Sequence, residues 1–254
     1  MATRSQAEKL LTSLPKAAGK AAGRRSQYSA STRRALIDVA QKLFTTQGYA
    51  GTSLDSIVAG AKVTKGALYH HFSGKQAVFE AVFEKVESDA SERIRRALRK
   101  SRDPWEKANL GLGEFLSVVQ APAYQRIVIL EGPAVLGYER FREREERSSF
   151  GLVGDMVRRI LSSSTYSMSD DMIDTFSRIF FGAMSAAGEA VIEAEDPPLA
   201  VARVEAALSF ILTGLRTLAE GGIELVEPGV SDEDAEGDTE EEDDEPADED
   251  PEES

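Results

Sequence analysis

The chain has 254 residues, of which 41% are hydrophobic, so it can bury one large core or two modest ones. It has no cysteine and only two histidines, which excludes disulfides, cysteine-ligated metal centres and thiol catalysis and argues against an imidazole-rich metal site. No apolar run approaches the roughly 18–20 residues that a membrane span requires. We therefore expect a soluble cytoplasmic protein with no cofactor, no metal and no membrane contact.

Charge is distributed unevenly along the chain. Residues 1–85 carry 13 basic and 5 acidic side chains, residues 86–226 carry 17 and 22, and residues 227–254 carry 17 acids and no base. The overall charge of −14 therefore comes largely from the C-terminal tail. It does not exclude an anionic partner for the basic N-terminal third.

The two ends of the chain are predicted to be disordered. Residues 1–30 form a basic, Ala- and Ser-rich arm interrupted by Pro15, Gly19 and Gly23, and residues 226–254 form an acidic tail with almost no apolar side chains. Arg24, Arg25 and the following Arg33 and Arg34 lie just before the first predicted helix, where they could bind an anionic partner specifically or could equally serve as a nonspecific anchor. The tail could compete with such a partner for the arm or only improve solubility.

Residues 31–85 show the apolar spacing of several short helices. The first has apolar residues three and four apart from Leu36 to Phe44 and should end at Gly48, and a shorter one follows from Leu54 to Ala61. Local signals mark the helix starts: capping boxes at Thr52/Asp55 and at Ser73/Gln76, an N-cap at Thr64, and a hydrophobic staple between Val63 and Leu68.

Longer helices are predicted in residues 86–225. Pro104 should open one helix through Val119, and Pro122 another that is interrupted at Gly132–Pro133. An amphipathic element covers residues 140–159, and the two most apolar helices cover residues 170–195 and 197–220. Because alternating strand patterns are missing, the predicted fold class is all-α.

Catalytic motifs are lacking. Gly111 and Gly113 begin a G-x-G, but Leu116 stands where a dinucleotide site needs glycine and no strand precedes it. P-loop, zinc-protease and serine-hydrolase motifs do not occur. We expect no enzymatic activity.

The most informative stretch is 52–72, where two short helices joined by a tight turn outline a helix-turn-helix. Lys65, Gly66, Tyr69 and His70 share an arc of the second helix that is clear of Leu68. Lysine can reach guanine or phosphate, and glycine lets the backbone approach a base. On pattern alone, a polar, solvated face of an ordinary helical hairpin is an equally good interpretation.

Residues 52–72, with the ending Ala-Leu-Tyr-His-His-Phe and the following Lys75, closely resemble the DNA-binding signature of the tetracycline-repressor (TetR) family. The resemblance extends over about 55 residues, from the helix before Gly48 to about Phe83. It implies a homodimer of helical subunits, each with a three-helix DNA-binding domain, here residues 31–85, and a larger ligand-binding and dimerisation domain, here residues 86–225.

The resemblance also implies roles for individual residues. Base edges would be contacted by Lys65, Gly66 and Ala67, and phosphates by Thr64, Tyr69, His71 and Lys75. Leu54 stands where some members carry a hydroxyl, so Thr52, Ser53 or a main-chain N–H would replace that contact. The helical arc favours His70 for a phosphate and the family pattern favours His71, and both stay candidates.

Taken together, these features predict a ligand-responsive regulator, most simply a repressor, that binds a near-palindromic operator in double-stranded DNA. It would form a homodimer through its last two helices and be released by a small apolar or aromatic ligand. The alternatives are a helical enzyme or lipid-binding protein with this fold, or an architectural DNA binder without ligand control. Candidate ligand contacts are the apolar and aromatic residues of the middle helices: Trp105, Phe115, Val119, Tyr124, Phe150, Met156, Phe176 and Phe180.

Overall fold

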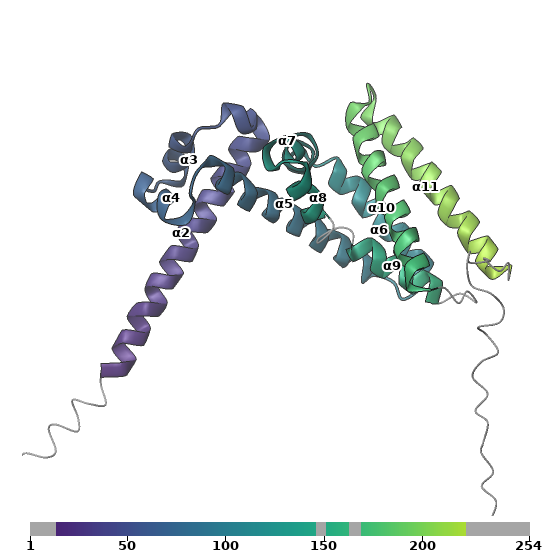
Figure 1. The fold of residues 1–254 in the computed structure, drawn as a ribbon, viewed down its shortest axis with the longest axis horizontal. Coiled ribbons are helices and arrows are strands. Elements are labelled where there is room, and N and C mark those ends of the chain that lie inside the picture. Colours follow the sequence, from purple (N-terminus) through teal and green to yellow (C-terminus); the bar gives the residue numbers. More distant parts are fainter. Residues whose placement is uncertain (1–13, 146–150, 163–168, 222–254) are drawn as a thin grey trace, which may run out of the picture.

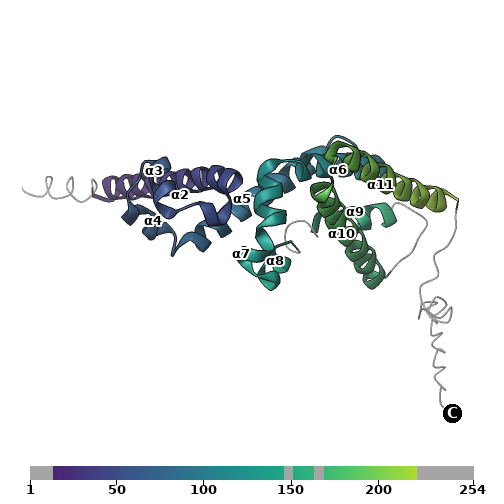
Figure 2. The ribbon, with the colours of Figure 1, turned by 90° about the horizontal axis from the view of Figure 1, so that it is seen from above.

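The computed structural model describes residues 14–145, 151–162 and 169–221, and every regular element in these ranges is a helix (Figure 1). The predicted all-α class is confirmed. One end of the molecule contains α2 (Leu14–Gly51), α3 (Leu54–Ala61) and α4 (Lys65–His71), and α5 (Lys75–Leu98) leads away from it. The other end contains α6 (Pro104–Val119), α9 (Gly151–Ser162), α10 (Asp170–Glu193) and α11 (Pro197–Glu220), as both ribbon views show (Figures 1 and 2).

Three short elements lie between these ends. They are the π-helix η1 (Tyr124–Leu130), α7 (Gly132–Leu136) and α8 (Tyr138–Glu145). The break predicted at Gly132–Pro133 is present, because η1 ends before Glu131 and α7 begins at Gly132. Residues 140–159, expected as one amphipathic element, belong to α8 and α9, with residues 146–150 outside the described ranges.

The N-terminal arm differs from expectation. Residues 14–30, predicted to be disordered, form the first turns of α2, which project beyond the rest of the N-terminal end (Figure 1). Pro15 is the second residue of the helix, where no intrahelical N–H is needed, and the alanines that follow have the highest helix propensity. These two features outweigh the cost of Gly19 and Gly23. Residues 1–13 of the arm and the whole acidic tail lie outside the described residues.

Gly48 interrupts α2 as predicted. Its φ of 74° and ψ of 173° lie in a region that only glycine adopts readily, so the chain changes direction there. In the redirected chain, the N-cap of α3 is Ser53 and not Thr52. The Ser53 hydroxyl accepts a hydrogen bond from the Ser56 backbone N–H at 3.0 Å, and the Ser56 hydroxyl accepts one from the Ser53 N–H at 3.2 Å.

The predicted Thr52/Asp55 capping box is therefore wrong by one position. Two neighbouring hydroxyl residues were available, and Thr52 is instead buried with its hydroxyl donating to the Gly48 carbonyl at 2.8 Å. The Ser73/Gln76 box is also wrong, because Gly74 occupies the N-cap of α5 without a side-chain bond. The Thr64 cap of α4 is confirmed, since its hydroxyl accepts from the Ala67 N–H at 3.2 Å.

One apolar core extends from the N-terminal helices into the second half of the chain. Leu36, Phe44, Ile57 and Leu68 are completely buried in it, together with Phe79, Val82 and Phe83 of α5. The same cluster includes Ile127 and Val128 of η1 and Leu136 of α7. The domain boundary proposed between residues 85 and 86 falls inside α5, and the core continues across it.

Candidate DNA interface and ligand cavity

Helix α4 presents a polar surface beside the N-terminal core. Leu68 holds it in place from below, while Lys65, Gly66, Tyr69 and His70 are exposed, Tyr69 by 59% of its surface. A Cβ placed on Gly66 would meet only the Thr64 hydroxyl, at 3.9 Å, so the backbone there is open to close approach. The arc expected from helical spacing is thus the solvent-facing side of α4, with Ala67 at its edge.

Lys65 is engaged by a neighbouring carboxylate in the free protein. Its Nζ lies 2.8 Å from Asp55 Oδ1 of α3, and both side chains are about two-thirds exposed, at 65% and 68%. The hydrogen bond to Asp55 raises the pKa of Lys65 above its ordinary value. Because the pair is solvated, a phosphate or a guanine edge can displace Asp55 at little cost.

The two histidines of α4 have different surroundings. His70 is exposed, whereas His71 is half-buried and its ring lies 5.1 Å from that of His70. Burial lowers the pKa of His71, and repulsion from His70 and Arg33 lowers it further. Arg33 stacks over the Phe72 ring at 5.3 Å, which places a cation next to this end of α4. Both histidines remain candidates for a phosphate contact.

The remaining predicted DNA contacts differ in accessibility. Ser53 and Thr64 are exposed, and Lys75 lies over the Tyr49 ring at 4.4 Å with its Nζ 3.4 Å from the Ala50 carbonyl. Thr52, by contrast, is 2% exposed and its hydroxyl is already committed to Gly48. The burial of Thr52 argues against the predicted phosphate contact from its side chain, and leaves that contact to Ser53 or a backbone N–H.

A cavity of about 290 Å³ lies among α5, α6, η1 and α8–α11. Its volume is near the lower end for small-molecule sites. Seven of the eight residues proposed as ligand contacts line it, and the eighth, Phe150, lies outside the described residues. The seven are Trp105, Phe115, Val119, Tyr124, Met156, Phe176 and Phe180.

Several wall residues were not anticipated as ligand contacts. Ile94 and Leu98 of α5, Phe141 of α8 and Phe181 of α10 line the cavity. Four further lining residues lie on the last two helices, through which the dimer was predicted: Met184, Leu208, Leu212 and Leu215. Helical spacing identifies an inward face but does not distinguish a face against another helix from one against a cavity.

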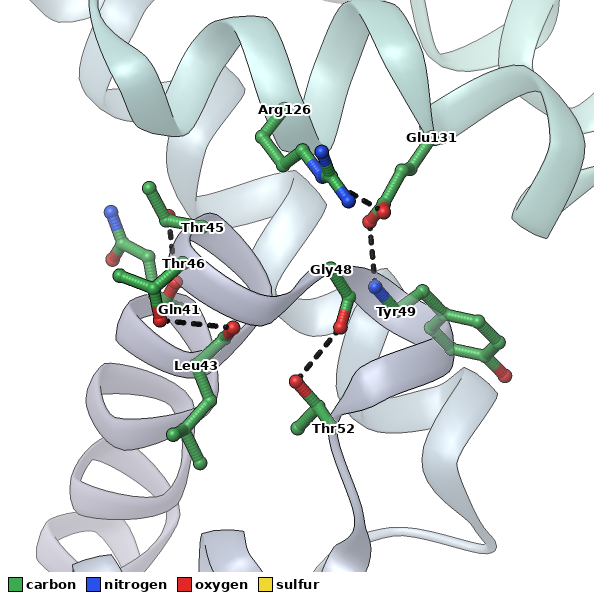
Figure 3. A network of polar contacts seen from close by, with 9 residues as sticks. All are labelled: Gln41, Leu43, Thr45, Thr46, Gly48, Tyr49, Thr52, Arg126 and Glu131. Carbon is green, nitrogen blue, oxygen red and sulfur yellow. Dashed lines mark hydrogen bonds and ion pairs between the residues drawn. The ribbon is translucent and has the colours of Figure 1, made fainter.

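The π-helix η1 connects this cavity to the N-terminal end of the molecule. Tyr124, Val128 and Ile129 contribute to the cavity wall, whereas Arg126 and the following Glu131 reach α2. One Glu131 oxygen accepts a hydrogen bond from the Tyr49 N–H at 2.9 Å, and the other pairs with Arg126 Nε at 3.0 Å (Figure 3). We call this arrangement of Arg126 and Glu131 on Gly48 and Tyr49 the clamp.

The outer faces of α10 and α11 are apolar and open to solvent. Phe210 is 80% exposed and Ile179 63%, while Ile211 and Leu218 are also exposed. Helix α11 is long and apolar enough, by length and composition alone, to cross a membrane. A single such helix is weak evidence for a span, because the core helix of a soluble protein passes the same test.

Two family profiles match the chain. That for bacterial regulatory proteins of the tetR family matches residues 36–82, which include α3 and α4, and that for tetracyclin repressor-like C-terminal domains matches residues 105–215. Among curated relatives, the HTH-type transcriptional regulator AcrR of Shigella flexneri is 42% identical over 66 residues, covering 26% of this chain and 31% of the relative. The regulator SrpR of Pseudomonas putida is 32% identical over 101 residues, covering 40% and 47%. The chain thus aligns with less than half of the length of each.

Solved structures extend the likeness to the whole fold. A TetR-family transcriptional regulator from Pectobacterium atrosepticum is 29% identical, with a TM-score of 0.63 over 74% of this chain and 96% of that one. The regulator RolR, solved with resorcinol bound, is 20% identical with a TM-score of 0.57 over 80% and 98%, a likeness of fold alone. These relatives and neighbours are named as transcription regulators, not as enzymes.

Proposed function

This chain belongs to the tetR family of bacterial regulatory proteins, and from that premise we propose that it is a ligand-responsive repressor of transcription. It would bind a near-palindromic operator as a homodimer in the cytoplasm and release it when a small apolar or aromatic molecule fills the cavity. The observation that carries this proposal is the exposed polar face of α4, which lies in the segment that matches the tetR family profile. One continuous core connects α4 to η1, and η1 lines the cavity.

We propose that α4 reads DNA in the major groove. Lys65 and Gly66 face base edges, with Ala67 beside them, and Tyr69, Thr64 and Lys75 hold phosphates. On binding, Lys65 exchanges Asp55 for DNA. Lysine contacts to guanine specify sequence, whereas contacts to phosphate fix the register.

The exposed faces of α10 and α11 support dimerisation through these two helices. Phe210, Ile179 and Ile211 would be covered by the same surface of a second copy, and small residues such as Ala183 and Gly214 allow close approach. A two-fold dimer gives each subunit one half-site of a near-palindrome. Burial in such a dimer interface would also account for the apolar composition of α11 without a membrane.

We propose that ligand control runs through η1 and the clamp. A molecule entering the cavity contacts Tyr124 and Val128, and a shift of η1 is passed to Gly48 and Tyr49 through Glu131. π-helical turns often mark functional sites. By linkage, a ligand that weakens DNA binding must bind the free protein more tightly than the DNA-bound protein, by the same factor.

The proposal is tested by DNA binding to fragments flanking the chain's own gene. Lys65→Ala and Tyr69→Ala should weaken specific binding by about 5- to 150-fold, the range for a lost base or anchoring contact. Lys100→Ala removes the same charge at the far end of α5 and should bind within about twofold of wild type. If all three variants bind DNA with the affinity of the wild type, α4 is not the helix that reads DNA.

The two alternatives predict other results. An enzyme or lipid-binding protein with this fold would show no sequence-specific retardation of any fragment. An architectural DNA binder would retard fragments with little sequence preference and would not respond to any ligand.

A further inference from the structure

The cavity wall carries a single carboxylate. Among the lining residues that the structure describes, only Tyr124 and Glu189 have ionisable side chains, and the other polar side chains at the wall include Ser91 and Ser185. Glu189 follows Ser185 by one turn of α10, so the two lie on the same face of that helix and form a short polar stripe. The rest of the wall is mainly aliphatic and aromatic.

The position of Glu189 is fixed by its neighbour. Gly188 is buried, and a Cβ there would lie 3.6 Å from Val119 and 3.7 Å from Ile129, so α10 packs closely on α6 and η1 at this point. Glu189 itself is exposed, which places its carboxylate where the wall meets solvent. Within the described part of the chain it makes no ion pair.

An occupant that extends to the rim of the cavity meets this carboxylate. A purely apolar molecule that covered Glu189 would remove water from an uncompensated charge, which is costly. A carboxylic acid would be repelled by it. A protonated amine would instead pair with the carboxylate, while its apolar body packs on the aliphatic and aromatic side chains of the wall.

We propose that the cavity binds lipophilic cations, meaning molecules with an aromatic or aliphatic body and one ammonium group that pairs with Glu189. This inference rests on the proposed function in that such a cation would be the effector that releases DNA. Binding of the cation, however, can be measured on the protein without DNA, so the two proposals can fail separately.

Three matched probes test the charge requirement: 4-phenylbutylamine, 4-phenylbutan-1-ol and 4-phenylbutanoate, which share one body and carry positive, zero and negative charge at neutral pH. Calorimetry measures the binding of each probe, and the fluorescence of Trp105, the only tryptophan of the chain and a lining residue of the cavity, is the second readout. The amine should bind tighter than the alcohol by roughly three- to tenfold, and the acid should bind weakest.

Two variants assign the preference to one residue. Glu189→Gln should bring the amine and the alcohol within about twofold and improve binding of the acid, and Glu189→Asp should keep the order of the three probes. Glu193→Gln, one turn further along α10 and outside the cavity wall, should leave the preference unchanged.

The inference is overturned if the acid or the alcohol binds as tightly as the amine, if Glu189→Gln keeps the wild-type preference, or if none of the probes occupies the cavity. If the amine binds through Glu189 but leaves operator affinity unchanged, the inference stands and the proposed ligand control of DNA binding fails.

Discussion

Replacing Gly48 by alanine should test the clamp directly. Gly48 has a φ of 74° and a ψ of 173°, a region almost restricted to glycine, so a side chain there costs about 1–3 kcal/mol of backbone strain. The new Cβ would also lie 2.6 Å from Glu131 Oε1 and closer still to the Arg126 guanidinium, so both side chains must move away.

The loss of the clamp adds to this strain. The hydrogen bond from the Tyr49 N–H to Glu131 is charge-assisted and its acceptor is 17% exposed, so it contributes about 1.5–3 kcal/mol. The ion pair with Arg126, which is 45% exposed, contributes less than about 1 kcal/mol. Because displacement of the clamp is partial, we expect Gly48→Ala to reduce the free energy of unfolding by about 2–5 kcal/mol.

The measurement is urea unfolding at a fixed protein concentration, since the proposed dimerisation would make the apparent stability concentration-dependent. Gly113→Ala is the matched control. A Cβ at this exposed glycine of α6 meets nothing within 4 Å, so the variant should be neutral or up to about 1 kcal/mol more stable.

A double-mutant cycle separates strain from the clamp. In a Glu131→Ala background there is no carboxylate to displace, so Gly48→Ala should cost only the backbone strain, and the two changes should be non-additive by about 1–2 kcal/mol. A loss below about 1 kcal/mol for Gly48→Ala, or strictly additive effects, would refute this account of the contact between η1 and α2.

Three further predictions concern the other surfaces. Asp55→Asn frees Lys65 and removes a negative charge next to the proposed DNA face, so the affinity for operator and for non-operator DNA should rise, and the increase should be smaller at high salt. Fluorescence anisotropy titrations measure both affinities, and unchanged affinities would mean that Lys65 does not approach DNA. Phe210→Asp places a charge in the proposed dimer face and should give a monomer in light scattering at micromolar concentration, whereas the control Glu220→Gln at the end of the same helix should stay dimeric. If Phe210→Asp is still a dimer, the interface does not include this face of α11. The pKa of His71 in the folded protein lies below its ordinary value of 6.5, so the unfolded chain takes up the proton more readily and the free energy of unfolding should fall as the pH drops below about 6.5. His71→Gln should flatten this part of the curve of unfolding free energy against pH, and an unaltered slope would show that His71 does not cause it.

The site on α4 could be anticipated from the sequence because it is built from local signals. Thr64 caps the helix, Leu68 anchors it, and a helical period of 3.6 residues then sets which side chains face solvent. The cavity wall was partly anticipated for the same reason. Aromatic residues on the inward faces of the middle helices were evident, but the gap between helices depends on how they pack.

The clamp could not be anticipated. Glu131 and Tyr49 are 82 residues apart, and neither stands in a motif. The Thr52 hydroxyl was misassigned because its role depends on the turn at Gly48, which directs it inward and leaves Ser53 at the cap. The helical start of α2 was missed because single glycines and a proline were weighed without their positions in the helix.

The continuous core has a mechanical consequence. Since Phe44 of α2, Phe79 of α5 and Ile127 of η1 are packed into one cluster, the N-terminal helices and η1 should turn as one rigid body instead of hinging at the predicted domain boundary between residues 85 and 86. The pivot would then lie toward the far end of α5, near the ion pair between Arg93 and Glu114 of α6.

A 24-residue helix such as α5 is about 36 Å long, so a tilt of about 5° at one end displaces the other end by about 3 Å. In a dimer the two displacements are opposite, and a change of about 6 Å is large against a half-site separation of about 34–36 Å. On the proposed mechanism, a small expansion of the cavity would thereby be converted into a misfit with two successive major grooves.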